Sequence, residues 1–474
     1  MSQHRRRDIF ADIAGPQDRP SQPQPVSRRT DALVEPQPPS LPRKVLPLAA
    51  VDPNAVFAPQ DRLDTAEKLD RELDELRARY APFMENLAPP IEETRLVLPL
   101  ETFDWRVETD GDQADFGRVV AGLGEWETVQ IPHYGGPLGR AATLYRTTFD
   151  ITETMLAQGD VFLCCQGIDY RAHAFVNGQY IGSHEGFFAP FELEATRAVH
   201  VGANVLVVRV ENDAILMGND SWGEDGHLYE GDKVYAATGP GYDDPLVGWH
   251  HCPPGMGIFQ NITIEARPSL FIYDIFVRPL PEQSAAEAWI EVYNTGRLRE
   301  EIGLSLSLYG QNFAQTIFED QAYELAGPAG PTVNTYRLPF EIANARLWDT
   351  ETPWLYQLQV RLTNGVGETL DIQRLQFGMR SFHMETEHEP KGRFYLNGVE
   401  VRLRGANTMG HMQQCVIRSD WEQLRDDILL AKICHMNFFR LTQRPVQREI
   451  YEMCDRLGIM TQTDLPLFGV LRRN

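Results

Sequence analysis

Polar side chains follow three predicted strands in the last part of the sequence. Asn407 follows a short strand, Arg440 ends a buried strand, and Asp464 follows a third strand. In a barrel of alternating strands and helices, the groups that face a ligand lie at the carboxyl ends of the strands. A guanidinium placed there can hold a carboxylate ionised through paired, charge-assisted hydrogen bonds. We therefore expect Arg440 and Asp464 to point into one shared hollow.

Cysteine and metal chemistry find no support in the residue spacing. The six cysteines show neither metal-ligand spacing nor the density of a disulfide scaffold. We interpret them as reduced, mostly buried thiols, with Cys164 and Cys165 on opposite faces of one strand. The sequence predicts no metal site and no organic cofactor.

The long segment from Asp213 to Met256 carries eight acidic residues, one lysine and the two tryptophans Trp222 and Trp249. Long loops without regular structure are often functional, so this loop is a candidate rim for a pocket. A calcium site is conceivable, although its oxygen ligands lack a regular spacing. A solvated loop without a specific role is an equally open interpretation.

The elements that would position Arg440 and Asp464 follow a β-α-β-α-β pattern. A hairpin with the turn Asn397-Gly398 comes first, and helices are predicted over residues 419–434 and 446–457, between the strands. A full barrel needs about 250 residues, whereas roughly a third of that number follows Phe394. Residues 386–474 are therefore predicted to be a truncated (β/α)8 TIM barrel with its first three β/α units.

Two all-β regions precede this segment. Residues 90–268 contain short, evenly spaced strands and the hairpin turn Asn177-Gly178, which favours a jelly-roll sandwich. Residues 269–385 include the strictly alternating stretch 304–308, and the size of the region favours an immunoglobulin-like sandwich.

The N-terminal region divides into a leader and a helix. Residues 1–64 are predicted to be a disordered leader, since the first 60 residues hold eleven prolines and few aromatic residues. Residues 65–89 are predicted to contain an amphipathic helix, with its apolar stripe at Leu69, Leu73, Leu76 and Tyr80. The simplest partner for this stripe is the domain that follows it.

The charge and the absence of apolar runs limit the classes of partner. The formal net charge of −23 disfavours nucleic acid and anionic lipid. A secretory signal and a membrane-spanning run are both missing from the 474 residues. We expect a cytoplasmic protein without nucleic-acid or membrane partners.

Short sequence motifs in all three regions resemble those of glycoside hydrolase family 2, which includes β-galactosidases, β-glucuronidases and β-mannosidases. The motifs occur in the same order as in that family. They are residues 167–172, 176–178, 182–186, 190–191 and 257–260 in the first sandwich, 347–348, 353–356 and 377–380 in the second, and 404–407, 437–440, 454–458 and 464–466 in the barrel. The resemblance implies a sugar-binding sandwich, a middle sandwich and a barrel that carries the chemistry.

The resemblance implies roles for five residues. Asn407 corresponds to an asparagine near the sugar, His411 lies near the place of an active-site histidine, and Arg440 corresponds to an arginine that braces the catalytic carboxylates. Asp464 falls where the family often has an acidic residue. Gln443 stands where the galactosidase and glucuronidase branches usually carry a histidine. All five are candidate substrate-binding residues.

The catalytic residues themselves are missing from the sequence given. Retaining glycosidases use two carboxyl groups, one as the acid/base and one as the nucleophile. In this family both are glutamates, at strands four and seven, and the acid/base follows an asparagine. An Asn-Glu pair does not occur in the 474 residues, and Glu422, Glu449 and Glu452 fall within predicted helices. We name no catalytic residue.

Three functional hypotheses remain open. The first is a retaining exo-β-glycosidase, β-galactosidase-like, of which this chain is the N-terminal half and is inactive alone; its sugar can also be a mannoside or a glucuronide. The second is a non-catalytic carbohydrate-binding or scaffold protein. The third is one half of a split enzyme. A three-strand barrel edge exposes unpaired backbone, so we expect aggregation, a homo-oligomer or a complementing C-terminal half.

Overall fold

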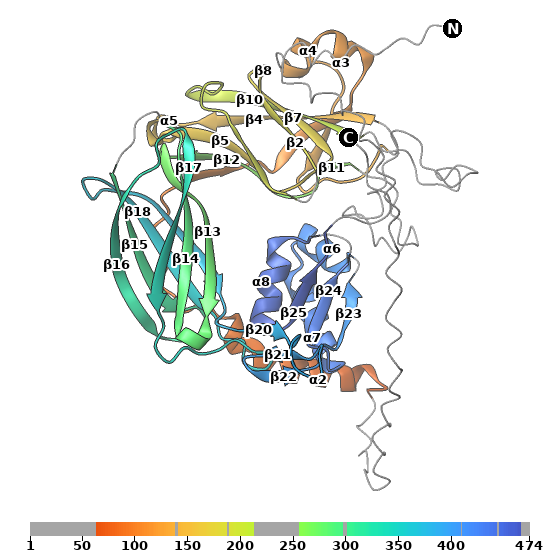
Figure 1. Ribbon diagram of the computed structural model, residues 1–474. Coiled ribbons are helices and arrows are strands. Elements are labelled where there is room, and N and C mark those ends of the chain that lie inside the picture. Colours follow the sequence, from red (N-terminus) through yellow and green to blue (C-terminus); the bar gives the residue numbers. More distant parts are fainter. Residues whose placement is uncertain are drawn as a thin grey trace, which may run out of the picture. The chain divides into compact units, whose positions relative to one another are not determined.

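The computed structural model describes residues 63–137, 141–186, 189–212, 256–296, 301–408, 410–442 and 445–465. Residues 72–474 form one compact unit (Figure 1). The predicted leader, apart from its last two residues, and the acidic loop up to residue 255 lie outside the described residues. Helices and strands keep the labels of Figure 1.

The first β region forms two large sheets and one small sheet. The orders are β1-β12-β5-β9, β3-β2-β4-β10-β7-β8 and β11-β6. The strands are β1 (Leu96–Pro99), β2 (Thr102–Val107), β3 (Glu127–Gln130), β4 (Ala141–Ile151), β5 (Asp160–Cys165), β6 (Ile168–Asp169), β7 (Arg171–Val176), β8 (Gln179–Glu185), β9 (Phe191–Glu194), β10 (Gly202–Asn212), β11 (Gly257–Ile258) and β12 (Ile262–Arg267). Helices α3 (Asp110–Ala114), α4 (Phe116–Val120) and α5 (Glu153–Gln158) lie between strands.

The side chains of this sandwich alternate as the sequence predicts. Cys165 belongs to the core between the large sheets, whereas its neighbour Cys164 packs outside that core, with Phe162 and Phe271. The predicted turn Asn177-Gly178 joins β7 to β8, and both residues have positive φ, 52° and 79°, as a tight hairpin turn requires.

Two local features of this sandwich depend on pairing between distant strands. The chain near Ile258 forms two separate strands, β11 and β12, which pair in different sheets. Residues 202–204 belong to β10 and pair with β4. Buried Asn204 makes this possible, because its side chain accepts from the His200 amide and donates to the Gly202 carbonyl.

The second β region is a sandwich of two sheets, β13-β14-β17 and β16-β15-β18-β19. The strands are β13 (Leu270–Leu280), β14 (Ala285–Asn294), β15 (Glu301–Gly310), β16 (Thr316–Ala326), β17 (Thr332–Glu341), β18 (Tyr356–Asn364) and β19 (Thr369–Phe377), with the 3-10 helix η2 (Pro281–Gln283) after β13. Leu304, Leu306 and Leu308 are fully buried between the sheets. The alternation that predicted a half-solvated strand is confirmed.

A buried carboxylate joins this sandwich to the chain that precedes the first one. Asp371 on β19 is 0% exposed and accepts from the Arg95 guanidinium (3.2 and 2.7 Å), the Thr94 hydroxyl (2.8 Å) and the Ile272 amide of β13 (3.0 Å). Burial by itself raises the pKa of Asp371, but the hydrogen bonds and charge of Arg95 hold it below its ordinary value. The ionised carboxylate therefore fastens both sheets of the second sandwich to the strand that begins at Leu96.

The last region combines a hairpin sheet with a parallel sheet. The hairpin sheet is β20-β21-β22 and the parallel sheet is β23-β24-β25. The elements are β20 (Phe382–Met384), β21 (Phe394–Leu396), β22 (Val399–Val401), β23 (Gly405–Thr408), α6 (His411–Ile417), α7 (Trp421–Ile433), β24 (Phe438–Leu441), α8 (Arg448–Leu457) and β25 (Met460–Thr463). The helices lie beside the parallel sheet (Figure 1), so the predicted β-α-β-α-β order is confirmed.

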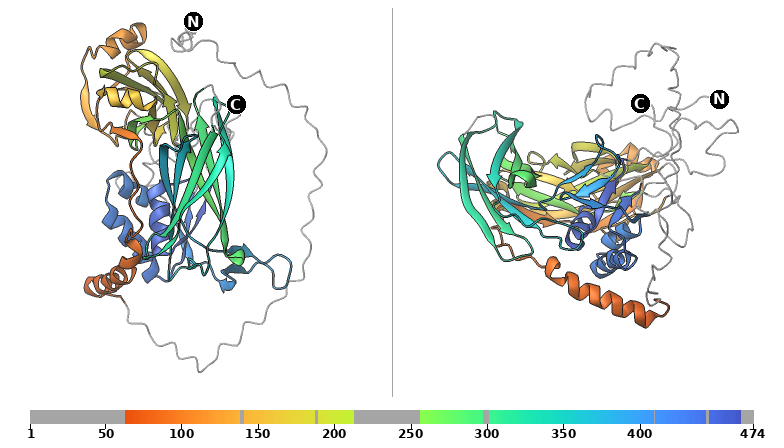
Figure 2. Two further views of the ribbon diagram at one scale, coloured as in Figure 1. Left: turned by 90° about the vertical axis from the view of Figure 1, so that its left-hand side faces the viewer. Right: turned by 60° about the horizontal axis from the view of Figure 1, so that its bottom comes forward.

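The N-terminal helix α2 (Ala66–Met84) does not pack on the domain that follows it, contrary to the prediction. Its buried residues Leu73, Tyr80 and Phe83 join the core cluster of helices α6, α7 and α8 (Figure 2). The Tyr80 hydroxyl donates to the Thr350 carbonyl (3.2 Å), and the Lys432 ammonium lies 4.6 Å from the Tyr80 ring centre. A stripe of apolar residues shows that a helix packs against another surface. It does not show which surface, because any sufficiently apolar one can cover the stripe.

Replacement of Asp371 by alanine is expected to lower the free energy of unfolding by roughly 3–5 kcal/mol, because Arg95 loses its buried counter-charge. In the wild type, this stabilisation is complete above the ordinary aspartate pKa of about 3.9 and disappears as pH falls through the lower pKa of the folded state. Urea unfolding at several pH values measures both effects. Glu400→Ala, which breaks an exposed pair with Arg393, is the control and should cost less than about 1 kcal/mol.

Replacement of Tyr80 by alanine is expected to loosen α2, since a buried ring and its hydrogen bond are removed. A loss on the order of 3 kcal/mol corresponds to roughly hundredfold faster amide exchange in α2. Hydrogen exchange followed by mass spectrometry measures this change. The control, Glu75→Ala, alters an exposed residue of the same helix. Equal exchange in both variants would show that the ring does not hold the helix.

Candidate functional site

Three polar residues form one row across the parallel sheet. Asn407 on β23 is opposite Arg440 on β24, and Arg440 is opposite Gln462 on β25. Residues paired in a parallel sheet project from the same face, so these three side chains share a face near the carboxyl ends of their strands.

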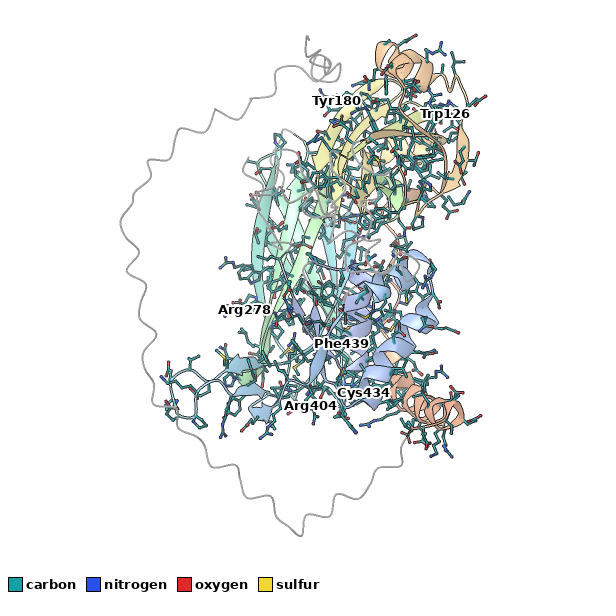
Figure 3. The ribbon with its side chains drawn as sticks, turned by 90° about the vertical axis from the view of Figure 1, so that its right-hand side faces the viewer. Trp126, Tyr180, Arg278, Arg404, Cys434 and Phe439 are labelled. Atoms are coloured by element: carbon teal, nitrogen blue, oxygen red, sulfur yellow. The ribbon has the colours of Figure 1, made fainter. Side chains whose placement is uncertain are left out.

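The two faces of the sheet have different neighbours. Phe439 and Leu441 project from the other face and are buried in the cluster with the helices; Figure 3 labels Phe439 within this region. Phe438 and Met460, two positions before Arg440 and Gln462, pack with Leu396 of the hairpin. Below the polar row, the apolar residues of its face are therefore covered by the hairpin.

Arg440 and Asp464 form a two-point ion pair. Arg440 Nε donates to Asp464 Oδ1 (3.2 Å) and Arg440 Nη2 donates to Asp464 Oδ2 (2.5 Å). Gln462 Nε2 also donates to Oδ1, at 3.2 Å. The Arg440 side chain is 40% exposed and that of Asp464 is 14% exposed. The carboxylate is therefore fixed in orientation, while the guanidinium, which has five N–H donors, still reaches solvent.

The strand register that brings these groups together depends on two small features. A Cβ atom on Gly405 would lie 1.9 Å from the Phe438 carbonyl oxygen, so β23 can approach β24 only with glycine there. Asn437 fastens the start of β24, because its amide accepts from the Arg404 N–H (2.9 Å) and donates to the Arg402 carbonyl (3.0 Å).

The other predicted site residues are placed as follows. Asn407 is exposed in the same row as Arg440. His411 is the exposed first residue of α6, a helix that the sequence did not predict. Gln443 lies outside the described residues. The functional roles of all five residues stay predictions.

Gln462 was missed by the sequence reasoning. It contacts Asp464 and lies beside Arg440 in the sheet. The available signal was the period of two along a strand, since residue 462 shares a face with residue 464 when the strand continues that far.

The described part of the chain shows neither a candidate metal-ion site nor a candidate membrane-spanning helix. It contains no group of three or more His, Cys, Asp or Glu side chains placed to hold a metal ion. None of its helices combines the length and apolar character needed to span a membrane.

Three known domain families match successive parts of the chain. Residues 137–240 match "Glycosyl hydrolase 2 galactose-binding domain-like", residues 270–380 match "Glycosyl hydrolases family 2", and residues 389–471 match "Glycosyl hydrolases family 2, TIM barrel domain". Their order is the order of the two sandwiches and the parallel sheet.

Individual proteins show the same similarity. A beta-galactosidase of Alteromonas mediterranea is 24% identical over 317 residues, which are 66% of this chain and 27% of that protein. The solved beta-glucuronidase of Bacteroides uniformis has a TM-score of 0.59 and 19% identity, covering 78% of this chain and 42% of that chain. The beta-D-mannosidase of Dictyoglomus thermophilum has a TM-score of 0.59 and 19% identity, covering 78% and 47%.

This chain spans about a quarter of the length of the curated beta-galactosidase and less than half of each of these two solved structures. The structural likenesses, at below 25% identity, show the fold. The three successive domain matches show the family: the chain belongs to glycoside hydrolase family 2.

Proposed function

We propose that this chain forms the N-terminal part of a retaining exo-β-glycosidase that hydrolyses O-glycosyl bonds of β-galactosides or related sugars. The observation that carries the proposal is the Arg440–Asp464 ion pair at the carboxyl ends of parallel strands, with Asn407 and Gln462 beside it. In barrel enzymes, ligand-binding groups gather at this end of the sheet.

The local chemistry suits a neutral, hydroxyl-rich ligand. The ion pair is close to neutral as a unit, and the carboxylate presents a fixed acceptor for a sugar hydroxyl. The guanidinium and the exposed Asn407 amide supply donors. These groups position a sugar ring; they do not attack it or protonate its leaving group.

The two catalytic glutamates belong, in this proposal, to later strands of the barrel. A retaining mechanism places its two carboxyl groups about 5–5.5 Å apart on either side of the scissile bond. Because the pair acts together, supporting residues cannot replace both members, and the 474-residue chain alone has no turnover. The remaining strands come from a continuing chain or from a complementing C-terminal half.

The sugar is proposed from the similar proteins. The curated relative described above is a beta-galactosidase, and the two solved structures are a beta-glucuronidase and a beta-D-mannosidase. Galactosides are therefore the first substrates to test, with mannosides and glucuronides as the alternatives. Neither a cytoplasmic location nor a role for residues 213–255 has structural support, and both stay predictions.

Hydrolysis of nitrophenyl β-galactoside, β-mannoside and β-glucuronide tests the proposal. We expect no turnover by the chain alone and measurable turnover when the polypeptide that completes the barrel is present, either fused or added. Release of nitrophenol is the measurement. A completed barrel that hydrolyses none of the three substrates, with its fold verified by circular dichroism, contradicts the glycosidase and favours a binding protein.

Arg440→Lys in the active, completed enzyme is expected to lower kcat/KM by roughly 10²-fold. A lysine keeps the charge but cannot make the two-point contact that orients Asp464, and small displacements of positioning groups have effects of this size. The matched control is Arg448→Lys on α8, an exposed arginine paired with Glu452. Equal activity in both variants would show that Arg440 does not contribute to the site.

A further inference from the structure

A second hollow lies between the second sandwich and helix α8. Its volume is about 430 Å³, and strands β13 and β19, the segment after β19 and Asp455 near the end of α8 line it. Small-molecule sites in proteins commonly enclose about 300–1,000 Å³. Phe276 and Phe382, which are 54% and 42% exposed, contribute aromatic surface to its walls.

This hollow is separate from the Arg440–Asp464 pair. Helix α8 runs back along the sheet, ends at Gly458, and the chain then enters β25 at Met460. Asp455 therefore lies near the start of that strand, whereas Asp464 follows its end. The two sets of polar residues occupy opposite ends of the parallel sheet.

The hollow is lined by a buried amide. The side-chain atoms of Gln376 are inaccessible to solvent, and its Oε1 has no hydrogen-bond partner among the described residues. The Gln376 amide also interacts with the Asp455 carboxyl and favours its ionised form. A buried acceptor without a partner is costly, so such groups usually contact an ordered water or a ligand.

The Asp455 carboxyl and the Arg380 guanidinium complete the polar lining of the hollow. Asp455 is held in place through its backbone, because Trp348 Nε1 donates to its carbonyl oxygen at 2.7 Å. The Arg380 guanidinium lies 5.2 Å from the Trp348 ring centre. One carboxylate and one guanidinium balance each other, so the lining has no charge preference for an anion or a cation.

The ligand chemistry follows from these groups. A hydroxyl group donates and accepts at once, and neighbouring hydroxyls match an amide and a carboxylate together. The aromatic and aliphatic walls at Phe276, Phe382 and Leu375 suit the C–H face of a ring. We propose that this hollow is a non-catalytic binding site for a neutral, hydroxylated ring the size of one sugar residue.

The site acts independently of hydrolysis and does not rest on the proposed activity. Its ligand can be a free hexose or the terminal residue of a glycan, since both present the same ring. A sugar held here occupies the junction between the sandwich and the barrel without blocking the Arg440 end.

Isothermal titration calorimetry of the 474-residue chain with galactose, mannose, glucose and glucuronate tests the proposal. We expect saturable binding of at least one neutral hexose and weaker binding of glucuronate. An oligosaccharide that ends in the preferred hexose distinguishes a glycan terminus from the free sugar. If none of these probes gives saturable binding, the proposal is wrong.

Two sets of variants locate the binding. Gln376→Leu removes the amide oxygen and the amide nitrogen at similar side-chain volume. We expect affinity to fall about tenfold or more, the equivalent of ~1.4 kcal/mol. The matched control Gln315→Leu changes an exposed glutamine of the same sandwich and should bind as wild type. If Gln376→Leu binds as wild type, the sugar occupies another part of the chain and this proposal is wrong.

The pH dependence gives a readout that a purely structural role would not change. Burial raises the pKa of Asp455 to about 6, against the opposing charge of Arg380 and a hydrogen bond from Gln376; Glu452 and Arg456 of α8 are the other charged groups that face it. Below that pH the carboxyl is protonated and loses acceptor strength. Affinity should therefore weaken by up to about tenfold from pH 7 to pH 5. In Asp455→Asn, affinity should not change with pH over this range. If this variant shows the same pH dependence as the wild type, Asp455 is not part of the binding site.

Discussion

The parallel register of β23, β24 and β25 is the constraint on which the candidate site depends. It places Asn407, Arg440 and Gln462 in one row and lets the backbone after β25 bring Asp464 to the guanidinium. A shift of one residue in β24 would turn Arg440 toward the helices and Phe439 toward the open face. Burial of Phe439 and Leu441 against the helices opposes that shift, so the apolar face of the sheet fixes the geometry of the polar face.

Polar contacts, more than apolar area, specify how the segments of the unit meet. Asp371 accepts hydrogen bonds from Arg95, Thr94 and the Ile272 amide, which belong to different parts of the chain. At the barrel segment, the Lys432 ammonium donates to the carbonyls of Thr350 (2.7 Å) and Gly458 (3.2 Å). Each arrangement is directional, and losing one member would leave a buried group unsatisfied. Such contacts therefore select one packing among several that would bury similar surface.

The sequence predicted those features that depend on local chemistry. Alternation at residues 304–308 and the turn pairs Asn177-Gly178 and Asn397-Gly398 identified strands and hairpins, because periodicity and positive φ are properties of neighbouring residues. Features set by distant contacts were missed or wrong: the short helix α6, the partner of α2, and Gln462 in the site. Arg440 and Asp464 were brought together as expected, since strand ends in a parallel sheet meet at one edge. The period of two along a strand places Gln462 on the face of Asp464, but its position beside Arg440 depends on the register between β24 and β25.

The two ends of the parallel sheet differ in chemistry because they have different neighbours. At the carboxyl end, Arg440 and Asp464 are partly exposed and already paired, so their charges are available for orientation without a large desolvation cost. At the other end, Gln376 and Asp455 are buried against the sandwich, and this burial raises the Asp455 pKa and keeps the Gln376 amide from solvent. The same sheet therefore presents an ion-paired surface at one end and a hollow lined by a weakly acidic carboxyl at the other. This difference follows both from the arrangement of the domains around the sheet and from the strands themselves, which begin with the apolar Phe438 and Met460 and carry Asn407, Arg440 and Gln462 near their carboxyl ends.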